Sequence, residues 1–136
     1  MPDQSFKIQL LLDQGRFEEA EVLIGECIGK DAEDPLLFYL MANARLAQGH
    51  LHPAEEAVRE SIRLDPESDW AHLTLSRILC EQSRFHEAET TIEKALELAP
   101  SDPDNWAQKA SLANRRAGRM SAGLRRGPPG RRRDRE

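Results

Sequence analysis

A period of 34 residues runs through this 136-residue sequence and constrains its fold more than any other feature. Alanine recurs at 20, 54 and 88, and apolar residues recur at the same spacing. The apolar columns are Phe17, Leu51 and Phe85; Ile24, Val58 and Ile92; and Ile28, Ile62 and Leu96. A fixed period of this length is typical of stacked repeats, in which each unit buries its apolar face against its neighbours. We therefore predict one repeat array.

Within each unit the apolar residues follow helical spacing, which a Gly- or Ser-containing turn and then Pro66 or Pro100 interrupt. Each unit is thus predicted to hold two helices. The first helices are expected near residues 3–14, 35–48, 69–82 and 103–116, and the second helices near 17–30, 51–64 and 85–98. The alanine column allows close helix packing, since its members lack bulk. The fold class that follows is an all-α solenoid of helix pairs, with three full units and a partial fourth.

The composition excludes an integral membrane protein. The longest apolar stretch, residues 36–42, is far shorter than the roughly 18 residues that a spanning helix needs. The N-terminus shows no basic segment leading into an apolar one, so no secretory signal is expected. Cys27 and Cys80 form neither a disulfide framework nor a clustered metal site. A cytoplasmic location is expected.

Charge divides the chain into two parts. Residues 1–114 carry ten basic and 22 acidic side chains, a formal charge of −12, whereas residues 115–136 carry nine arginines and two acids, a formal charge of +7. The segment 118–136 is rich in Gly, Pro and Arg and is predicted to be disordered. Three interpretations stand open: a functional basic arm, a solvated terminus, or an end that is not native sequence.

No catalytic motif is present: the sequence has no Gly-rich phosphate loop, no Gly-x-Ser-x-Gly elbow and no His-Glu-x-x-His pair. His50, His52 and His86 lie at predicted turns, where solvated side chains are the favoured interpretation over a surface metal site. We therefore expect neither catalytic residues, nor a cofactor, nor a bound metal. No small-molecule substrate is expected.

The repeat columns resemble the tetratricopeptide repeat, a 34-residue helix-turn-helix unit. With Pro35 as position 1, the second unit has Phe38, Met41, Ala42, Gly49, Ala54 and Pro66 at positions 4, 7, 8, 15, 20 and 32. Trp106 supplies the characteristic Trp of position 4 in the fourth unit, and His72 stands there in the third. The resemblance covers about residues 3–117, and the repeats are expected at 1–34, 35–68, 69–102 and 103–117. It implies a right-handed superhelix with a concave groove formed by the first helices.

The resemblance also implies which residues face a ligand, because family members bind peptides through positions 2, 5, 9, 12 and 13 of their first helices. Carried onto this chain, the expected groove residues are Leu36, Tyr39, Asn43, Leu46, Trp70, Leu73, Arg77, Cys80 and Asp104. Apolar side chains would supply buried area, Asn43 a hydrogen bond to a backbone, and Arg77 a contact with a carboxylate. The alternative interpretation is that several of these residues pack between helices.

One subclass of the family is set aside on its residues. Members that clamp the C-terminal carboxylate of heat-shock chaperones use Lys, Asn, Asn, Lys and Arg at fixed positions of three successive units. Those positions hold Ser5, Gln9, Leu40, Trp70 and Thr74 when counted from the first unit, and Tyr39, Asn43, Thr74, Asp104 and Gln108 from the second. Only Asn43 matches.

The predicted function is a protein-binding adaptor or scaffold that holds a peptide or an amphipathic helix in its groove. Three alternatives are a small secretion-type chaperone for a hydrophobic segment, the N-terminal scaffold of a larger protein, and a nucleic-acid-associated protein that uses the arginine tail. The acidic repeats disfavour nucleic acid. Because Trp106 belongs to an unfinished unit, a weak homodimer through that end is a further expectation.

Overall fold

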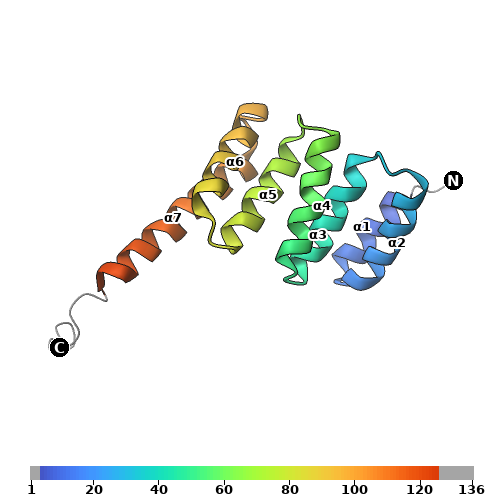
Figure 1. Cartoon of the computed structure of the whole chain (residues 1–136), viewed down its shortest axis with the longest axis horizontal. Coiled ribbons are helices and arrows are strands. Elements are labelled where there is room, and N and C mark those ends of the chain that lie inside the picture. The colour runs from blue at the N-terminus through green and yellow to red at the C-terminus, as the bar shows by residue number, and fades with distance from the viewer. Residues whose placement is uncertain (1–3, 126–136) are drawn as a thin grey trace.

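The computed structural model describes residues 4–125, and side chains as far as residue 118. This part of the chain is entirely helical: α1 (Gln4–Asp13), α2 (Phe17–Lys30), α3 (Pro35–Ala47), α4 (Leu51–Leu64), α5 (Asp69–Glu81), α6 (Phe85–Leu98) and α7 (Pro103–Arg125). Figure 1 shows the helices side by side in a row, with α7 projecting beyond the others. The predicted all-α solenoid is confirmed, and the first six helices match the predicted bounds within two residues.

In units one to three, the first helix is followed by a residue with a left-handed backbone conformation, always at the same repeat position. Gly15, Gly49 and Ser83 occupy position 15 of units one to three and have φ values of 75°, 81° and 63°. Glycine adopts positive φ without steric cost, whereas serine does so with strain. The next helix begins two residues later in each unit, so this turn sets the antiparallel pairing.

The fourth unit departs from this pattern, and the predicted helix end near residue 116 is wrong. Position 15 is Ala117, and α7 continues through it and through Gly118 to Arg125. Extending an existing helix adds a hydrogen bond for each residue fixed, while each glycine costs only about 1 kcal/mol relative to alanine. Residues 118–125 of the predicted disordered segment are therefore helical. Its remainder, residues 126–136, lies outside the described residues.

The core runs continuously through the stacked pairs. The alanine column is fully buried, and so are Ile24, Val58 and Ile92 in the adjacent aliphatic column. Neighbouring first helices pack on each other, α3 on α5 and α5 on α7, whereas no contact of comparable extent joins α4 to α6. The first helices consequently lie on the inner side of the array, where a concave surface is expected.

A polar contact recurs at each junction between units. Glu21 of α2 accepts a hydrogen bond from Gln48 and lies 3.8 Å from Arg45. One unit later, Glu55 of α4 accepts from Gln82 and from Arg84. At the last junction Glu89 of α6 pairs with Arg116, the residue in the same repeat position as the two glutamines. The second helix of each unit thus presents a glutamate to the unit that follows.

Candidate functional site

The predicted groove residues divide into three groups by exposure. Leu36, Arg77 and Asp104 are exposed, and Tyr39, Asn43, Leu46 and Trp70 are half-buried. Leu73 and Cys80 are buried in the core, with 6% and 3% of their surface exposed. These two residues therefore pack between helices, as the alternative interpretation allowed, and seven of the nine predicted residues remain accessible.

An aromatic pair joins the second and third units on the inner side. The Tyr39 ring of α3 and the Trp70 ring of α5 meet edge to face, with centroids 4.5 Å apart and planes at 66°. Aromatic pairs prefer this arrangement, because the positive edge of one ring meets the negative face of the other. Both rings remain partly exposed, so they offer a preformed apolar surface.

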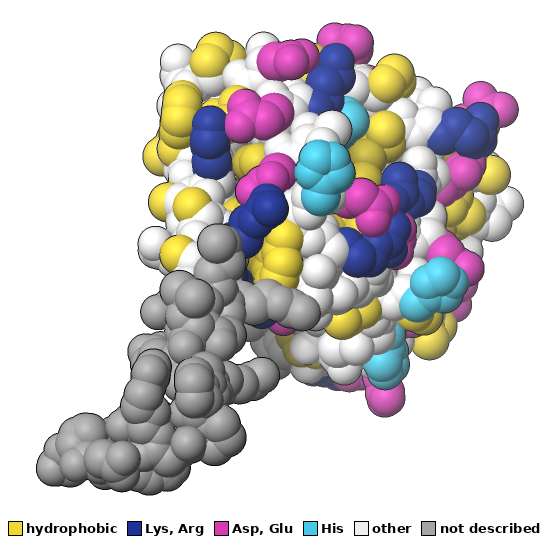
Figure 2. All heavy atoms as spheres, turned by 60° about the vertical axis from the view of Figure 1, so that its left-hand side comes forward, with side chains coloured by type: hydrophobic (Ala, Val, Ile, Leu, Met, Phe, Trp, Pro, Cys, Tyr) yellow, Lys and Arg dark blue, Asp and Glu magenta, His cyan; other side chains and the backbone are white. Residues whose placement is uncertain are grey.

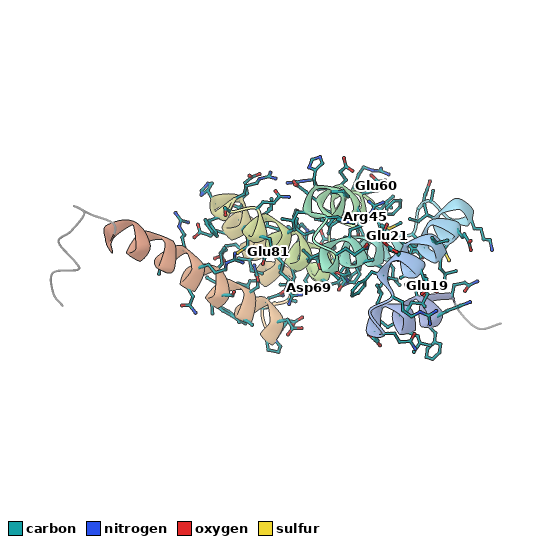
Figure 3. All side chains as sticks on the ribbon, turned by 90° about the horizontal axis from the view of Figure 1, so that it is seen from below. Glu19, Glu21, Arg45, Glu60, Asp69 and Glu81 are labelled. Atoms are coloured by element: carbon teal, nitrogen blue, oxygen red, sulfur yellow. The ribbon has the colours of Figure 1, made fainter. Side chains whose placement is uncertain are left out.

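A hollow of about 500 Å³ lies further along α3 and α5, seven residues after the aromatic pair on each helix; it is lined by Leu46, Gly49, Leu51, Arg77, Glu81 and Gln108. Arg77 is exposed there and forms no ion pair with any residue in the range 4–118. Glu81 lies on α5 (Figure 3) and accepts a 2.9 Å hydrogen bond from Arg115 of α7. The hollow therefore has an apolar wall at Leu46 and an unpaired guanidinium at Arg77, which suits a ligand carrying a carboxylate.

Hydrogen bonds fix the side chains beneath the hollow. Gln108 is buried and donates to the Ser76 hydroxyl at 3.2 Å, and that hydroxyl donates to the Ala88 carbonyl at 2.9 Å. Burial raises the pKa of the Cys80 thiol, which disfavours the reactive thiolate. Cys80 is therefore a packing residue rather than an accessible nucleophile.

The positions carried over from the resemblance include Glu81, at position 13 of the third unit, but not Gln108. Gln108 occupies position 6, where Leu40 and Thr74 are buried in the preceding units. The sequence signal for Gln108 was its polar side chain in a column that is buried in the two preceding units, since a buried polar residue requires a hydrogen-bonding partner.

Charged side chains of both signs are mixed on one face of the molecule. On the face in Figure 2, Lys and Arg side chains are interspersed with Asp and Glu. Ion pairs one helical turn apart occur among the described residues, such as Arg63 with Glu60 and Arg84 with Glu87. Within the described range, no group of three or more His, Cys, Asp or Glu side chains is arranged to hold a metal ion. None of the described helices is long and apolar enough to cross a membrane.

Comparison with known proteins identifies the repeat. The tetratricopeptide repeat family model matches residues 45–112, half of the chain. No curated protein matches the sequence.

Three solved tetratricopeptide repeat domains illustrate the similarity in fold. The first such domain of human RPAP3 is 19% identical with a TM-score of 0.80, over 85% of this chain and 91% of that one. The second domain of human RPAP3, solved with the HSP70 peptide SGPTIEEVD, is 20% identical with a TM-score of 0.75, over 80% and 91%. The Arabidopsis OM64 domain is 18% identical with a TM-score of 0.76, over 80% and 90%.

Proposed function

The chain belongs to the tetratricopeptide repeat family, and from that premise we propose that it is a non-enzymatic adaptor binding a peptide or an amphipathic helix in its concave groove. The observation that carries the proposal is that α3 and α5 hold the Tyr39–Trp70 pair and, seven residues further along each helix, the Leu46 and Arg77 side chains that line a hollow. Trp, Tyr and Arg are enriched among the residues that carry most of the binding energy at interfaces. Two solved domains of this fold, both from RPAP3, hold HSP70 and HSP90 peptides, which supports a peptide as the ligand class.

The ligand chemistry proposed here differs from that of the chaperone-tail clamp. An aromatic pair stands where that clamp would have a lysine, at Tyr39 or at Trp70 according to the unit counted first. Tyr39, Trp70 and Leu36 favour an apolar segment, and Arg77 favours one acidic residue within it. Asn43 has no side-chain hydrogen bond to another described residue, so its amide is available to a ligand backbone.

Both cysteines are free thiols, which is consistent with a reducing compartment, and we place the interaction in the cytoplasm. The face in Figure 2 does not favour the nucleic-acid alternative, since charges of both signs are mixed on it. Peptide binding by apolar burial should depend weakly on salt, whereas contacts with phosphates would weaken steeply as ionic strength rises.

The test begins with selection of peptides from a random phage library on the immobilised full-length chain. Selected peptides are then titrated by fluorescence anisotropy against wild type, Tyr39→Ala, Arg77→Glu and a control, Glu56→Gln, whose side chain is exposed on α4. Circular dichroism checks that every variant folds. We expect the two groove variants to weaken binding at least tenfold and the control to leave it unchanged. Equal affinities for all four proteins would contradict the proposed groove.

A further inference from the structure

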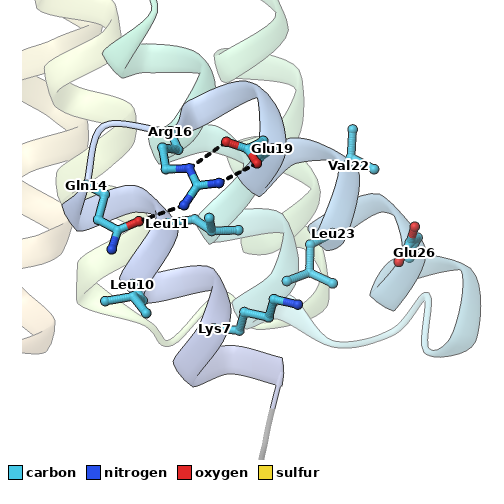
Figure 4. Close-up of a pocket in the computed structure, with 9 residues that line it drawn as sticks. All are labelled: Lys7, Leu10, Leu11, Gln14, Arg16, Glu19, Val22, Leu23 and Glu26. Carbon is cyan, nitrogen blue, oxygen red and sulfur yellow. Dashed lines mark hydrogen bonds and ion pairs between the residues drawn. The ribbon is translucent and has the colours of Figure 1, made fainter.

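At the N-terminal end of the array, the first helix pair exposes large apolar side chains on the side that faces away from the second unit. We call this surface, formed by Phe6, Leu10, Val22, Gln14 and Arg16, the N-terminal end face. Phe6, Leu10 and Val22 are 72%, 45% and 64% exposed. A hollow of about 540 Å³, shown in Figure 4, lies between α1 and α2 on this face. Apolar exposure of this kind marks a surface that other protein covers.

The repeat itself identifies what covers these positions elsewhere. Phe6 shares its position with Leu40, Thr74 and Gln108, and Leu10 shares its position with Ala44, Ile78 and Leu112; all six of these counterparts are buried. The fourth unit is informative, because α7 has a preceding pair but no following helix among the described residues. Its Gln108 and Leu112 are buried nevertheless, while Trp106 is 51% exposed. The helix pair before each unit is therefore what covers these two positions.

Within the array, an arginine and a glutamine bind a glutamate of the preceding unit, and the N-terminal end face carries the same arginine–glutamine pair. Arg84 donates to both oxygens of Glu87 and, through Nη1, to the Gln82 side chain and to Glu55 of the preceding unit. Gln82 donates to Glu55 as well.

Arg16 has the corresponding neighbours in the first unit. It donates to both oxygens of Glu19 and, through Nη1, to Gln14 at 3.2 Å (Figure 4). Each of the three residues lies 68 positions, or two periods, before its counterpart. The difference is that no described residue takes the place of Glu55. Arg16 and Gln14 are thus already arranged as the pair that receives a carboxylate.

We propose that the N-terminal end face docks an amphipathic helix of a partner protein, which sets a glutamate on Arg16 and Gln14 and apolar side chains on Phe6 and Leu10. The helix packs as α4 packs on α5 within this chain. The site is separate from the concave groove, since its residues come from α1, α2 and the turn between them. Charge complementarity and the apolar surface together define the partner helix.

In a second copy of this chain, none of the described second helices has a free junction glutamate to offer. The three second helices carry their junction glutamates at Glu21, Glu55 and Glu89, and each of these is already bonded to the unit that follows. Glu19, on the end face itself, is bonded to Arg16. Two end faces placed together would therefore bring apolar surface but no free junction glutamate.

The probe for this site is a fluorescent peptide of residues 50–67, the α4 segment that meets the equivalent positions of α5. Anisotropy is measured with the full-length chain. We expect saturable binding that weakens at least tenfold with Glu55→Gln in the peptide and also with Arg16→Gln in the protein. The two changes together should weaken it no further than either alone, because both remove one interaction. The matched control is Arg63→Gln in the protein, which removes an arginine from a similar exposed ion pair on α4 and should leave peptide affinity unchanged.

Several results would overturn the proposal. These are absence of saturable binding, equal binding of the Glu55→Gln peptide, and an equal effect of Arg63→Gln. A loss of binding in Tyr39→Ala but not in Arg16→Gln would place the peptide in the concave groove instead. Self-association in sedimentation velocity that Phe6→Ser abolishes would assign the end face to a second copy. Phe6→Ser also serves as a second variant, because a largely exposed side chain can be replaced without loss of the fold.

Discussion

A single serine holds the turn between α5 and α6 in a conformation that glycine holds in the two earlier turns. Ser83 has φ of 63°, and its side chain makes no hydrogen bond within the described residues. Ser83→Gly should therefore relieve strain and stabilise the protein by about 0.5–1 kcal/mol. This is the cost of the left-handed conformation for serine, minus the larger conformational entropy that glycine loses on folding. Urea unfolding followed by circular dichroism measures the change. The reverse substitution, Gly49→Ser, should destabilise the protein by a similar amount. Destabilisation by Ser83→Gly, or stabilisation by Gly49→Ser, would contradict this account.

The buried glutamate at the second junction predicts an acid-sensitive contribution to stability. Burial alone would raise the pKa of Glu55, but hydrogen bonds from Arg59 and Gln82 and the charge of Arg84 outweigh it and lower the pKa. A lowered pKa means that the ionised form stabilises the fold above the unfolded pKa of about 4.3, and that this contribution is lost as pH falls through the folded value.

Glu55→Gln should accordingly lower the free energy of unfolding at pH 7 by about 1.5–3 kcal/mol, the range for hydrogen bonds to charged groups. The deficit relative to wild type should shrink below about pH 4. Urea titrations at pH 7, 5 and 3.5 test this. Glu56→Gln is the control, since Glu56 is exposed and its ion-pair partner among the described residues is the exposed His52. A deficit that stays constant over this range would show that the charge of Glu55 does not matter.

At residue scale, the sequence predicted which repeat position each residue occupies better than it predicted how exposed each side chain is. His72 stands where the repeat has Trp106, and the structure shows why it is accepted: its ring nitrogen lies 3.0 Å from the Pro66 carbonyl, as Trp106 donates to the Pro100 carbonyl at 2.7 Å. Leu73 and Cys80 are expected in the groove from their position numbers, but both belong to the buried core. A position number does not record which neighbouring helix covers a side chain, because that depends on packing across units.

At the scale of the element, helix starts were more predictable than the last helix end. Pro35 and Pro103 begin α3 and α7, and Asp34 caps α3 by accepting a hydrogen bond from the Leu36 amide. These signals are local and readable. The continuation of α7 past Ala117 depends instead on the absence of a left-handed residue at one position, a signal that the glycine at 118 obscured.

The alanine column sets the distance between paired helices, so enlarging one of its members should separate them. Ala54 is completely buried. Ala54→Leu should overpack the contact and destabilise the protein by about 1–3 kcal/mol. Ala47→Leu, an exposed site on α3, adds the same atoms and should change stability by less than about 0.5 kcal/mol. Thermal unfolding of the two variants side by side makes the comparison, and equal melting temperatures would contradict the close-packing role.

For the whole molecule, the array has an inner surface made by first helices and two ends of unlike character. The period predicted the stacking and the unfinished unit in which Trp106 is 51% exposed, whereas the concave side was an expectation from the family resemblance. The period did not predict the N-terminal end face, although Phe6 and Leu10 stand in columns that are apolar or buried in later units. Recognising it requires knowing which neighbour buries each column, and that information exists only when the units are stacked in three dimensions.

A stacked array should lose structure from its ends, because each unit is stabilised mainly by its neighbours. α1 packs chiefly on α2, whereas α5 contacts α3, α4, α6 and α7. Ile8 in α1 and Ile78 in α5 are both fully buried, so Ile→Ala removes the same atoms at each site. Ile8→Ala should speed amide hydrogen exchange in α1 and α2 alone. Ile78→Ala should lower protection throughout and reduce global stability by about 2–5 kcal/mol. Hydrogen exchange read by mass spectrometry distinguishes the two patterns, and a uniform loss of protection in both variants would mean that the array unfolds as one unit.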